Sequence, residues 1–142
     1  MLLVDIQSAI MAELEALDDK YGKRLFLMVD VWNDTPEEMI KKTIRLPAAL
    51  VALSGGQFIG ESAIGSGRWD CRLGWDVFVL FENLRTPADA AAQGLGFINA
   101  VVSAVSNLRV GNDRIAPTGF DLVATIGGKS AYAINFSLEE RM

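Results

Sequence analysis

The stretch Gly127-Gly128-Lys129-Ser130 is the nearest approach in this chain to a nucleotide-binding motif. A phosphate-binding loop needs a further glycine five positions before Gly128, and the chain has Val123 there. Such a loop must also lead into a helix N-terminus, whereas the residues that follow alternate like a strand. We therefore predict a two-residue hairpin turn at the glycines, between strands at 120–126 and 129–137.

The residue types needed for acid–base and metal chemistry are scarce. The chain has no histidine, which removes the commonest general base and metal ligand. Its one cysteine, Cys71, excludes an internal disulfide and a thiolate zinc site, and its place in a strand pattern predicts a buried, inert thiol. Gly94-Leu95-Gly96 lacks the third glycine of a dinucleotide-binding motif and lies in a predicted helix.

The carboxylates do not form a catalytic pair either. Asp70 and Asp76 lie six residues apart on one strand face, about 20 Å, which is too far for a paired-carboxylate mechanism. Adjacent acids occur only where solvated charge is expected, at helix ends or in the tail: Asp18-Asp19, Glu37-Glu38 and Glu139-Glu140. A calcium or magnesium site built from separated loops stays open as an alternative. We predict no enzyme activity and no cofactor.

The composition of the chain argues against some classes of binding partner. The chain has 142 residues, 51% of them hydrophobic, and a net charge of −5. We expect one domain over residues 1–142 and no nucleic acid as main partner, because the basic residues are scattered. The N-terminus lacks the basic region and cleavage site of a signal peptide. No apolar run approaches the roughly 20 residues of a membrane helix, so we expect synthesis in a cytoplasm and no membrane partner.

Two helix starts share one pattern: a threonine, a proline at the first helical position and an acid three residues after the threonine. Thr35 and Thr86 are the predicted N-caps of helices that end near Lys42 and Asn107. A third helix is predicted at 5–18, with Asp5 as its N-cap. Residues 24–32, which are apolar on both faces, predict a buried strand.

Residues 68–82 carry the most regular pattern in the chain. Every second residue forms an apolar row: Trp69, Cys71, Leu73, Trp75, Val77, Val79 and Phe81. Short strands are predicted before it at 48–53 and 57–63, separated by Ser54-Gly55-Gly56. A strand over 68–82 would span about 50 Å, more than a compact domain of this size allows. The strand must bend, for example at Gly74, or project as a β-hairpin arm paired with 57–63.

The predicted fold class is therefore α+β: a mixed or antiparallel sheet packed against two main helices, with this hairpin arm as an alternative to a bent core strand. Trp69 and Trp75 each fit a core position or an interface anchor, since Trp and Arg are enriched at interfaces. The strand length favours an interface for its first part. Asp70 between two arginines fits a salt-bridge ladder on an exposed face. The interface candidates are Arg68, Trp69, Asp70 and Arg72, while Trp75 to Phe81 is assigned to the core.

The order of these elements resembles the small Mu-like phage and prophage tail proteins, and in layout it is similar to the lambda-type tail terminator fold. The closest matches are Leu-Pro-Ala-Ala-Leu-Val at 46–51, Phe-Glu-Asn-Leu-Arg at 81–85 and Tyr-Ala-Ile-Asn-Phe at 132–136. The resemblance covers roughly residues 3–137, and the segment 32–42 departs from it. It implies a virion tail component, made in the bacterial host cytoplasm, that acts without catalysis.

Proteins of this kind form a ring, commonly a hexamer, that caps the tail tube, stops its polymerisation and docks the head or neck. The partners implied are other copies of the chain, the tail tube protein and a head or neck connector protein. Another connector component is the nearest alternative. A small-ligand-binding α+β domain, which a pocket lined by Asp76 and arginines would favour, and a toxin–antitoxin or regulatory partner are alternatives from other classes.

Overall fold

The computed structural model describes residues 3–32, 35–42, 45–61, 63–110 and 113–141. Its centre is a five-stranded sheet in the order β1-β2-β3-β7-β6. The strands are β1 (Met28–Val31), β2 (Ala48–Glu61), β3 (Trp69–Glu82), β6 (Ala116–Ile126) and β7 (Lys129–Arg141). β1 pairs with β2 in parallel and all other neighbours are antiparallel, so the sheet is mixed and the α+β class is confirmed. A separate two-stranded ladder joins β4 (Arg109–Val110) and β5 (Asp113–Arg114).

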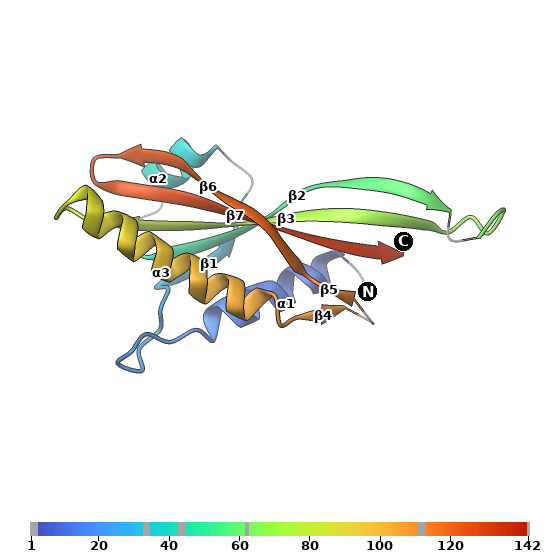
Figure 1. Cartoon of the computed structure of the whole chain (residues 1–142), viewed down its shortest axis with the longest axis horizontal. Coiled ribbons are helices and arrows are strands. Elements are labelled where there is room, and N and C mark those ends of the chain that lie inside the picture. Colours follow the sequence, from blue (N-terminus) through green and yellow to red (C-terminus); the bar gives the residue numbers. More distant parts are fainter. Residues whose placement is uncertain (1–2, 33–34, 43–44, 62, 111–112, 142) are drawn as a thin grey trace.

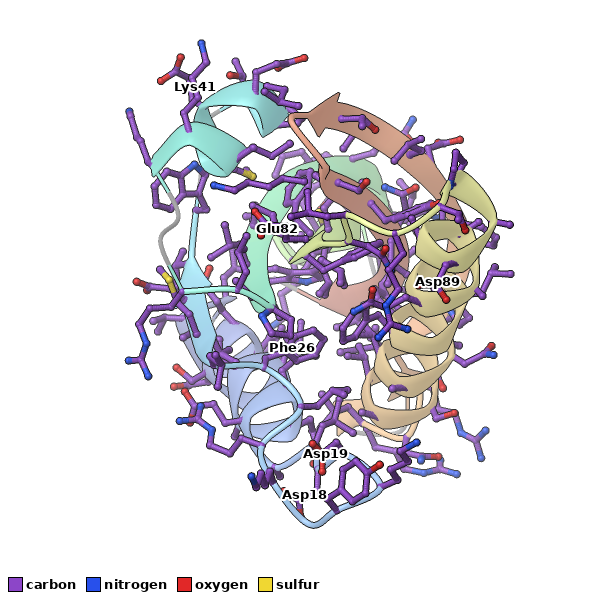
Figure 2. All side chains as sticks on the ribbon, turned by 90° about the vertical axis from the view of Figure 1, so that its left-hand side faces the viewer. Asp18, Asp19, Phe26, Lys41, Glu82 and Asp89 are labelled. Carbon is purple, nitrogen blue, oxygen red and sulfur yellow. The ribbon has the colours of Figure 1, made fainter. Side chains whose placement is uncertain are left out.

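Helices cover both faces of the sheet, unequally. The two main helices, α1 (Leu3–Glu15) and α3 (Pro87–Val105), lie on one face, and the short α2 (Pro36–Lys42) lies near the β6–β7 hairpin on the other (Figures 1 and 2). The main core forms between the sheet and the two long helices. Phe26 points into it (Figure 2) and stacks on Phe97 with ring centroids 5.6 Å apart. A smaller core forms under α2, where Met39 and Ile40 meet Leu50 and Leu80.

The two threonine caps are confirmed. The Thr86 hydroxyl accepts a hydrogen bond from the Asp89 backbone N–H at 3.1 Å. The Thr35 hydroxyl accepts one from the Glu38 N–H at 3.3 Å. Each side chain thus satisfies a backbone donor that the first helical turn leaves without a partner. α3 ends at Val105, with Ser106 as its C-cap.

The first helix differs from its prediction at both ends. It begins at Leu3, so Asp5 lies inside it and is not the N-cap. It ends at Glu15, earlier than predicted, because the chain turns back on itself: the Leu25 N–H donates to the Leu17 carbonyl at 2.8 Å. The Asp19 carboxylate stabilises this loop by accepting from two backbone N–H groups.

The prediction of a buried strand at 24–32 is wrong. β1 is four residues long, forms an edge of the sheet and has Asp30 and Val31 exposed. An edge strand has a neighbour on one side only, and here the apolar residue that enters the core, Phe26, precedes the strand. The predicted segment 24–32 is apolar because it combines a loop, whose Phe26 is buried, with a short edge strand.

The two short strands predicted at 48–53 and 57–63 are one continuous strand. β2 runs through Ser54-Gly55-Gly56 with register shifts between Leu53 and Gly55 and between Phe58 and Gly60. The glycine-rich stretch therefore accommodates bulges instead of ending a strand. The other glycine pair is the predicted turn: Gly127 and Gly128 have φ of 57° and 81°, as a type I′ hairpin requires. β6 and β7 extend beyond their predicted outer ends, to Ala116 and Arg141.

Candidate interaction surfaces

β3 is long without bending sharply. It pairs with β7 without a register shift from Asp70–Arg141 to Glu82–Lys129, so Gly74 is not a bend that interrupts the ladder. Figure 1 shows the β2–β3 hairpin reaching past the C-terminal end of β7. Residues 54–61 and 63–73 of this hairpin are called the arm below. Of the two predicted alternatives, the projecting arm is confirmed.

The arm carries an exposed aromatic pair. Phe58 on β2 is 64% exposed and Trp69 on β3 is 45% exposed. Their rings meet edge to face with centroids 6.3 Å apart, a favourable geometry for two aromatic side chains. Trp69 lies on the same strand face as Cys71 and Leu73, which are buried. The core row of β3 therefore continues into the arm, stays buried at Leu73 and Cys71, and becomes exposed at Trp69.

The four interface candidates do not form one patch. Trp69 faces the side of the sheet that carries the long helices, whereas Asp70 and Arg72 occupy the alternate positions of β3 and face the other side. Arg72 forms an ion pair with Glu139 of β7 at 3.0 Å, and both side chains are more than half exposed. Arg68 is exposed and precedes the strand. The salt bridge predicted on this face thus includes a partner, Glu139, that the sequence placed in a solvated tail.

Phe58 is an exposed aromatic residue of the arm that was not among the predicted interface candidates. Its register partner in the sheet is Cys71, so it belongs to the apolar face of the arm. The sequence could have indicated Phe58 through the predicted pairing of 57–63 with the first part of β3, because that pairing puts Phe58 next to Trp69. The intervening bulge at Phe58–Gly60 hides this pairing from a simple count of alternating residues.

A shallow groove lies on the polar side of the arm base, with a volume of about 450 Å³. Arg72 and Asp76 line it, the combination that would favour a ligand-binding domain. Both side chains are already engaged within the protein. Asp76 accepts a hydrogen bond from the Asn135 amide at 2.6 Å, and Arg72 pairs with Glu139. The charged side chains of this groove therefore hold β3 and β7 together, which favours a structural role for them over ligand binding.

A second groove, of about 440 Å³, lies between the start of α3 and the β6–β7 hairpin. It is mostly apolar, and Ala90, Ala91, Leu122 and Tyr132 are among its lining residues. Leu122 is 54% exposed. No charged residue occurs in α3 between Ala90 and Val105. This end of the molecule thus offers a mostly apolar, concave surface, in which Arg85 is a charged lining residue. It is called the α3 groove below.

α3 itself is long and apolar enough to cross a membrane by length and composition, which contradicts the expectation that no such run exists. Only 28% of the most apolar 18-residue stretch of this helix is buried. The buried residues, including Phe97, Ile98 and Val101, pack into the main core, as a helix on the surface of a globular protein does. The rest of this apolar helix is available for contact with another protein.

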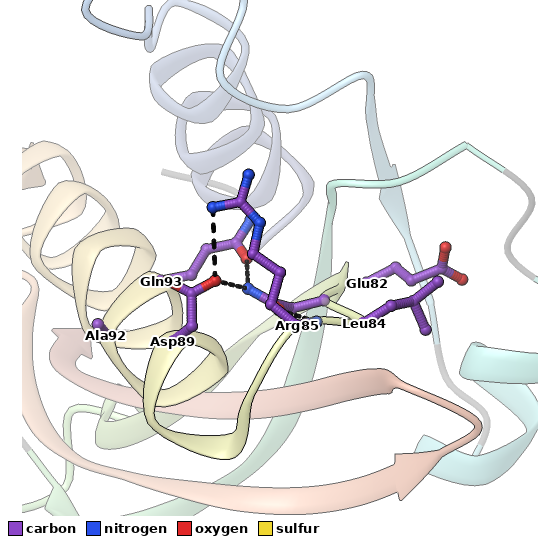
Figure 3. A pocket seen from close by; sticks show the side chains of 7 residues that line it. Glu82, Leu84, Arg85, Asp89, Ala92 and Gln93 are labelled. Atoms are coloured by element: carbon purple, nitrogen blue, oxygen red, sulfur yellow. Dashed lines mark hydrogen bonds and ion pairs between the residues drawn. The ribbon is translucent and has the colours of Figure 1, made fainter.

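The turn from β3 into α3 is held by a polar network rather than open for binding. Figure 3 shows Arg85, Asp89 and Gln93 converging there, with Glu82 pointing away, and Asn83 lines the same pocket. The Asn83 amide donates to Asp89 at 3.0 Å and to Gln93 at 2.8 Å, and the Arg85 guanidinium lies 3.9 Å from Asp89. These contacts tie the turn to the first turns of α3, so the network fixes the start of α3 beside the groove.

Within the described ranges, no three His, Cys, Asp or Glu side chains gather in a way that could hold a metal ion. Cys71 is 2% exposed, which confirms the predicted buried thiol.

Comparison with known proteins leaves the family open: no protein-family model matches the chain, and no curated protein matches its sequence.

Proposed function

We propose that this chain is a structural tail protein of a phage or prophage, a ring-forming tail terminator that caps the tail tube. In this role it stops tube polymerisation and supplies the docking surface for the head or neck connector. Its partners are other copies of itself, commonly six in a ring, the tail tube protein and the connector. It is made in the bacterial host cytoplasm and resides in the virion tail.

One observation carries the proposal: the arm takes an apolar row out of the core and ends it in the exposed pair Phe58–Trp69. Exposed aromatic side chains on a projecting hairpin are costly in a protein that stays alone, and they are the residues that dominate binding energy at interfaces. A ring needs one patch to meet a different patch on the neighbour. The arm and the α3 groove are two such patches on one chain.

The experiment is to measure native mass by light scattering on a sizing column, over a range of concentrations, with negative-stain images of the peak. A closed ring of about six copies is the expected result. For the terminator role, tails assembled without this protein should have tubes of unregulated length in electron micrographs. Tubes of normal length in its absence would contradict that role and favour the alternative of another neck component.

The ligand-binding alternative has one observation to test, the polar groove at Arg72 and Asp76. If the groove were a binding site, replacing Asp76 with Asn would change the affinity for a small ligand without changing native mass. The internal pairing of both charged groups favours the structural role instead.

A further inference from the structure

We propose that the arm of one copy inserts its Phe58–Trp69 pair into the α3 groove of a second copy. The inference rests on the proposed self-assembly and deepens it by naming the two surfaces that meet. The contact is head to tail: each copy offers its arm to one neighbour and its groove to another. Such a contact generates a ring when the rotation closes and an open filament when it does not.

The first argument is distance within one chain. β3 begins in the arm at Trp69 and ends at Glu82, immediately before the Asn83–Thr86 turn that lines the α3 groove. Thirteen steps of about 3.3 Å place the two surfaces roughly 40 Å apart. In Figure 1 the arm lies at one end of the long axis, and the start of α3 and the β6–β7 hairpin lie at the other. The arm cannot fill its own groove, so the chain leaves both an apolar projection and an apolar hollow exposed.

The second argument is chemical match. The groove is lined mainly by apolar and small side chains, with Leu122 half-exposed and Tyr132 and Ala90 partly buried. The aromatic pair of the arm is likewise apolar, and Ile64 at the arm tip is fully exposed. Aromatic side chains in apolar pockets are the usual centres of interface binding energy.

The third argument is charge. A net charge of −5 disfavours contact between copies in general. The arm is an exception, because its charged residues are two acids and two bases: Glu61, Asp70, Arg68 and Arg72. The facing helix has no charged residue between Ala90 and Val105. The groove lining itself adds the cation Arg85 and no acidic residue. The balanced arm therefore meets no carboxylate of the groove lining, so a second copy suits the groove despite the net negative charge of the protein.

The fourth argument is size. A stable interface engages about 20 to 30 residues on each side. The described arm residues other than the buried Cys71 and Leu73 come near the lower end of this range. A contact limited to the two aromatic rings would be too small, so the α3 groove and the neighbouring exposed side chains Leu95 and Phe120 must receive the arm along much of its length.

Complementation between two variants tests this inference. The arm variant is Phe58→Ser with Trp69→Ser, and the groove variant is Ala91→Glu with Leu122→Asp. The matched controls are Tyr21→Ser, an aromatic residue that is 75% exposed away from both surfaces, and Ala92→Glu, the next residue along α3. Circular dichroism and thermal melting confirm folding, and Leu122→Ser replaces the groove variant if that variant does not fold.

Each variant alone should stay monomeric at concentrations where the native chain assembles, with at least a tenfold rise in the concentration needed for association. Both controls should assemble like the native chain. An equimolar mixture of the two variants should form a one-to-one dimer and nothing larger, because it contains one intact arm and one intact groove per pair. Analytical ultracentrifugation measures these masses.

The outcomes separate this inference from the proposed function. Rings that persist in both variants, or a mixture that stays monomeric, overturn the arm–groove contact. A groove variant that still associates while the arm variant does not would mean that arms meet arms, which also overturns it. Mixed dimers together with open filaments of the native chain support the contact and contradict a ring-forming terminator.

Discussion

Trp75 and Trp69 lie six residues apart on the same face of the same strand, yet their surroundings differ completely. Trp75 is 1% exposed in the main core, whereas Trp69 is 45% exposed on the arm. The period-two pattern is identical at both positions. The comparison shows that a strand pattern specifies which face a side chain occupies, and that burial depends on which helices and strands cover that face. The part of the protein outside the arm is called the body below. The body part of β3 contributes to the core, whereas the tip of its arm part presents an exposed side chain.

The largest expected effect is at Trp75. Trp75→Ala should lower the free energy of unfolding by about 3–5 kcal/mol, because it opens a cavity in the core. Trp69→Ala, the matched change on the arm, should cost about 1 kcal/mol or less, because the side chain is already half in water. Chemical denaturation of monomeric protein measures both. Equal losses would contradict the division between body and arm.

A similar contrast, between a closely packed position and an open one, predicts opposite effects at two glycines of α3. A Cβ at Gly94 would lie 2.7 Å from the Tyr132 ring, so Gly94→Ala should destabilise the body by about 1–3 kcal/mol. A Cβ at Gly96 would meet nothing within 4 Å, so Gly96→Ala should stabilise the helix by up to about 1 kcal/mol. Melting temperatures compare the two variants. If both changes stabilise, the helix does not pack as closely on the sheet as described.

A smaller effect is expected at the cap of α3, which belongs to the body. Thr86→Ala removes the acceptor of the Asp89 N–H and should cost about 1 kcal/mol. Thr86→Ser keeps the hydroxyl and serves as the control. Denaturation curves should place the serine variant near the native protein, and a serine variant as unstable as the alanine variant would contradict the capping role.

The smallest effect on stability is expected at Arg72. Its ion pair with Glu139 is exposed on both sides, so Arg72→Gln should change the free energy of unfolding by less than about 1 kcal/mol. Added salt should make the native protein and the variant more alike, because it screens an exposed pair. A loss of several kcal/mol at either salt concentration would place Arg72 in the body rather than on a solvated face.

Features encoded by neighbouring residues could be predicted from the sequence. The caps at Thr35 and Thr86, the turn at Gly127-Gly128 and the apolar row of β3 depend on local spacing, and the structure confirms them. The excess length of β3 depends only on residue count and rise, so the sequence could predict that the strand either bends or projects as an arm, and the pairing in the structure decides between the two.

What could not be predicted depends on contacts between distant segments. β1 is an edge strand because of its place in the sheet order, which its own composition does not contain. Phe58 meets Trp69 through a bulged pairing, and Arg72 meets Glu139 through a strand 67 residues away. The α3 groove requires the β6–β7 hairpin to lie beside a helix start, and no local pattern specifies that.

The most direct test of the central claim, that the arm is an assembly surface, is native mass against concentration for three proteins measured in parallel. These are the native chain, the Phe58→Ser/Trp69→Ser variant and the Tyr21→Ser control. We predict that the native chain and the control assemble while the arm variant stays a folded monomer. Assembly of all three at the same concentrations would contradict the claim.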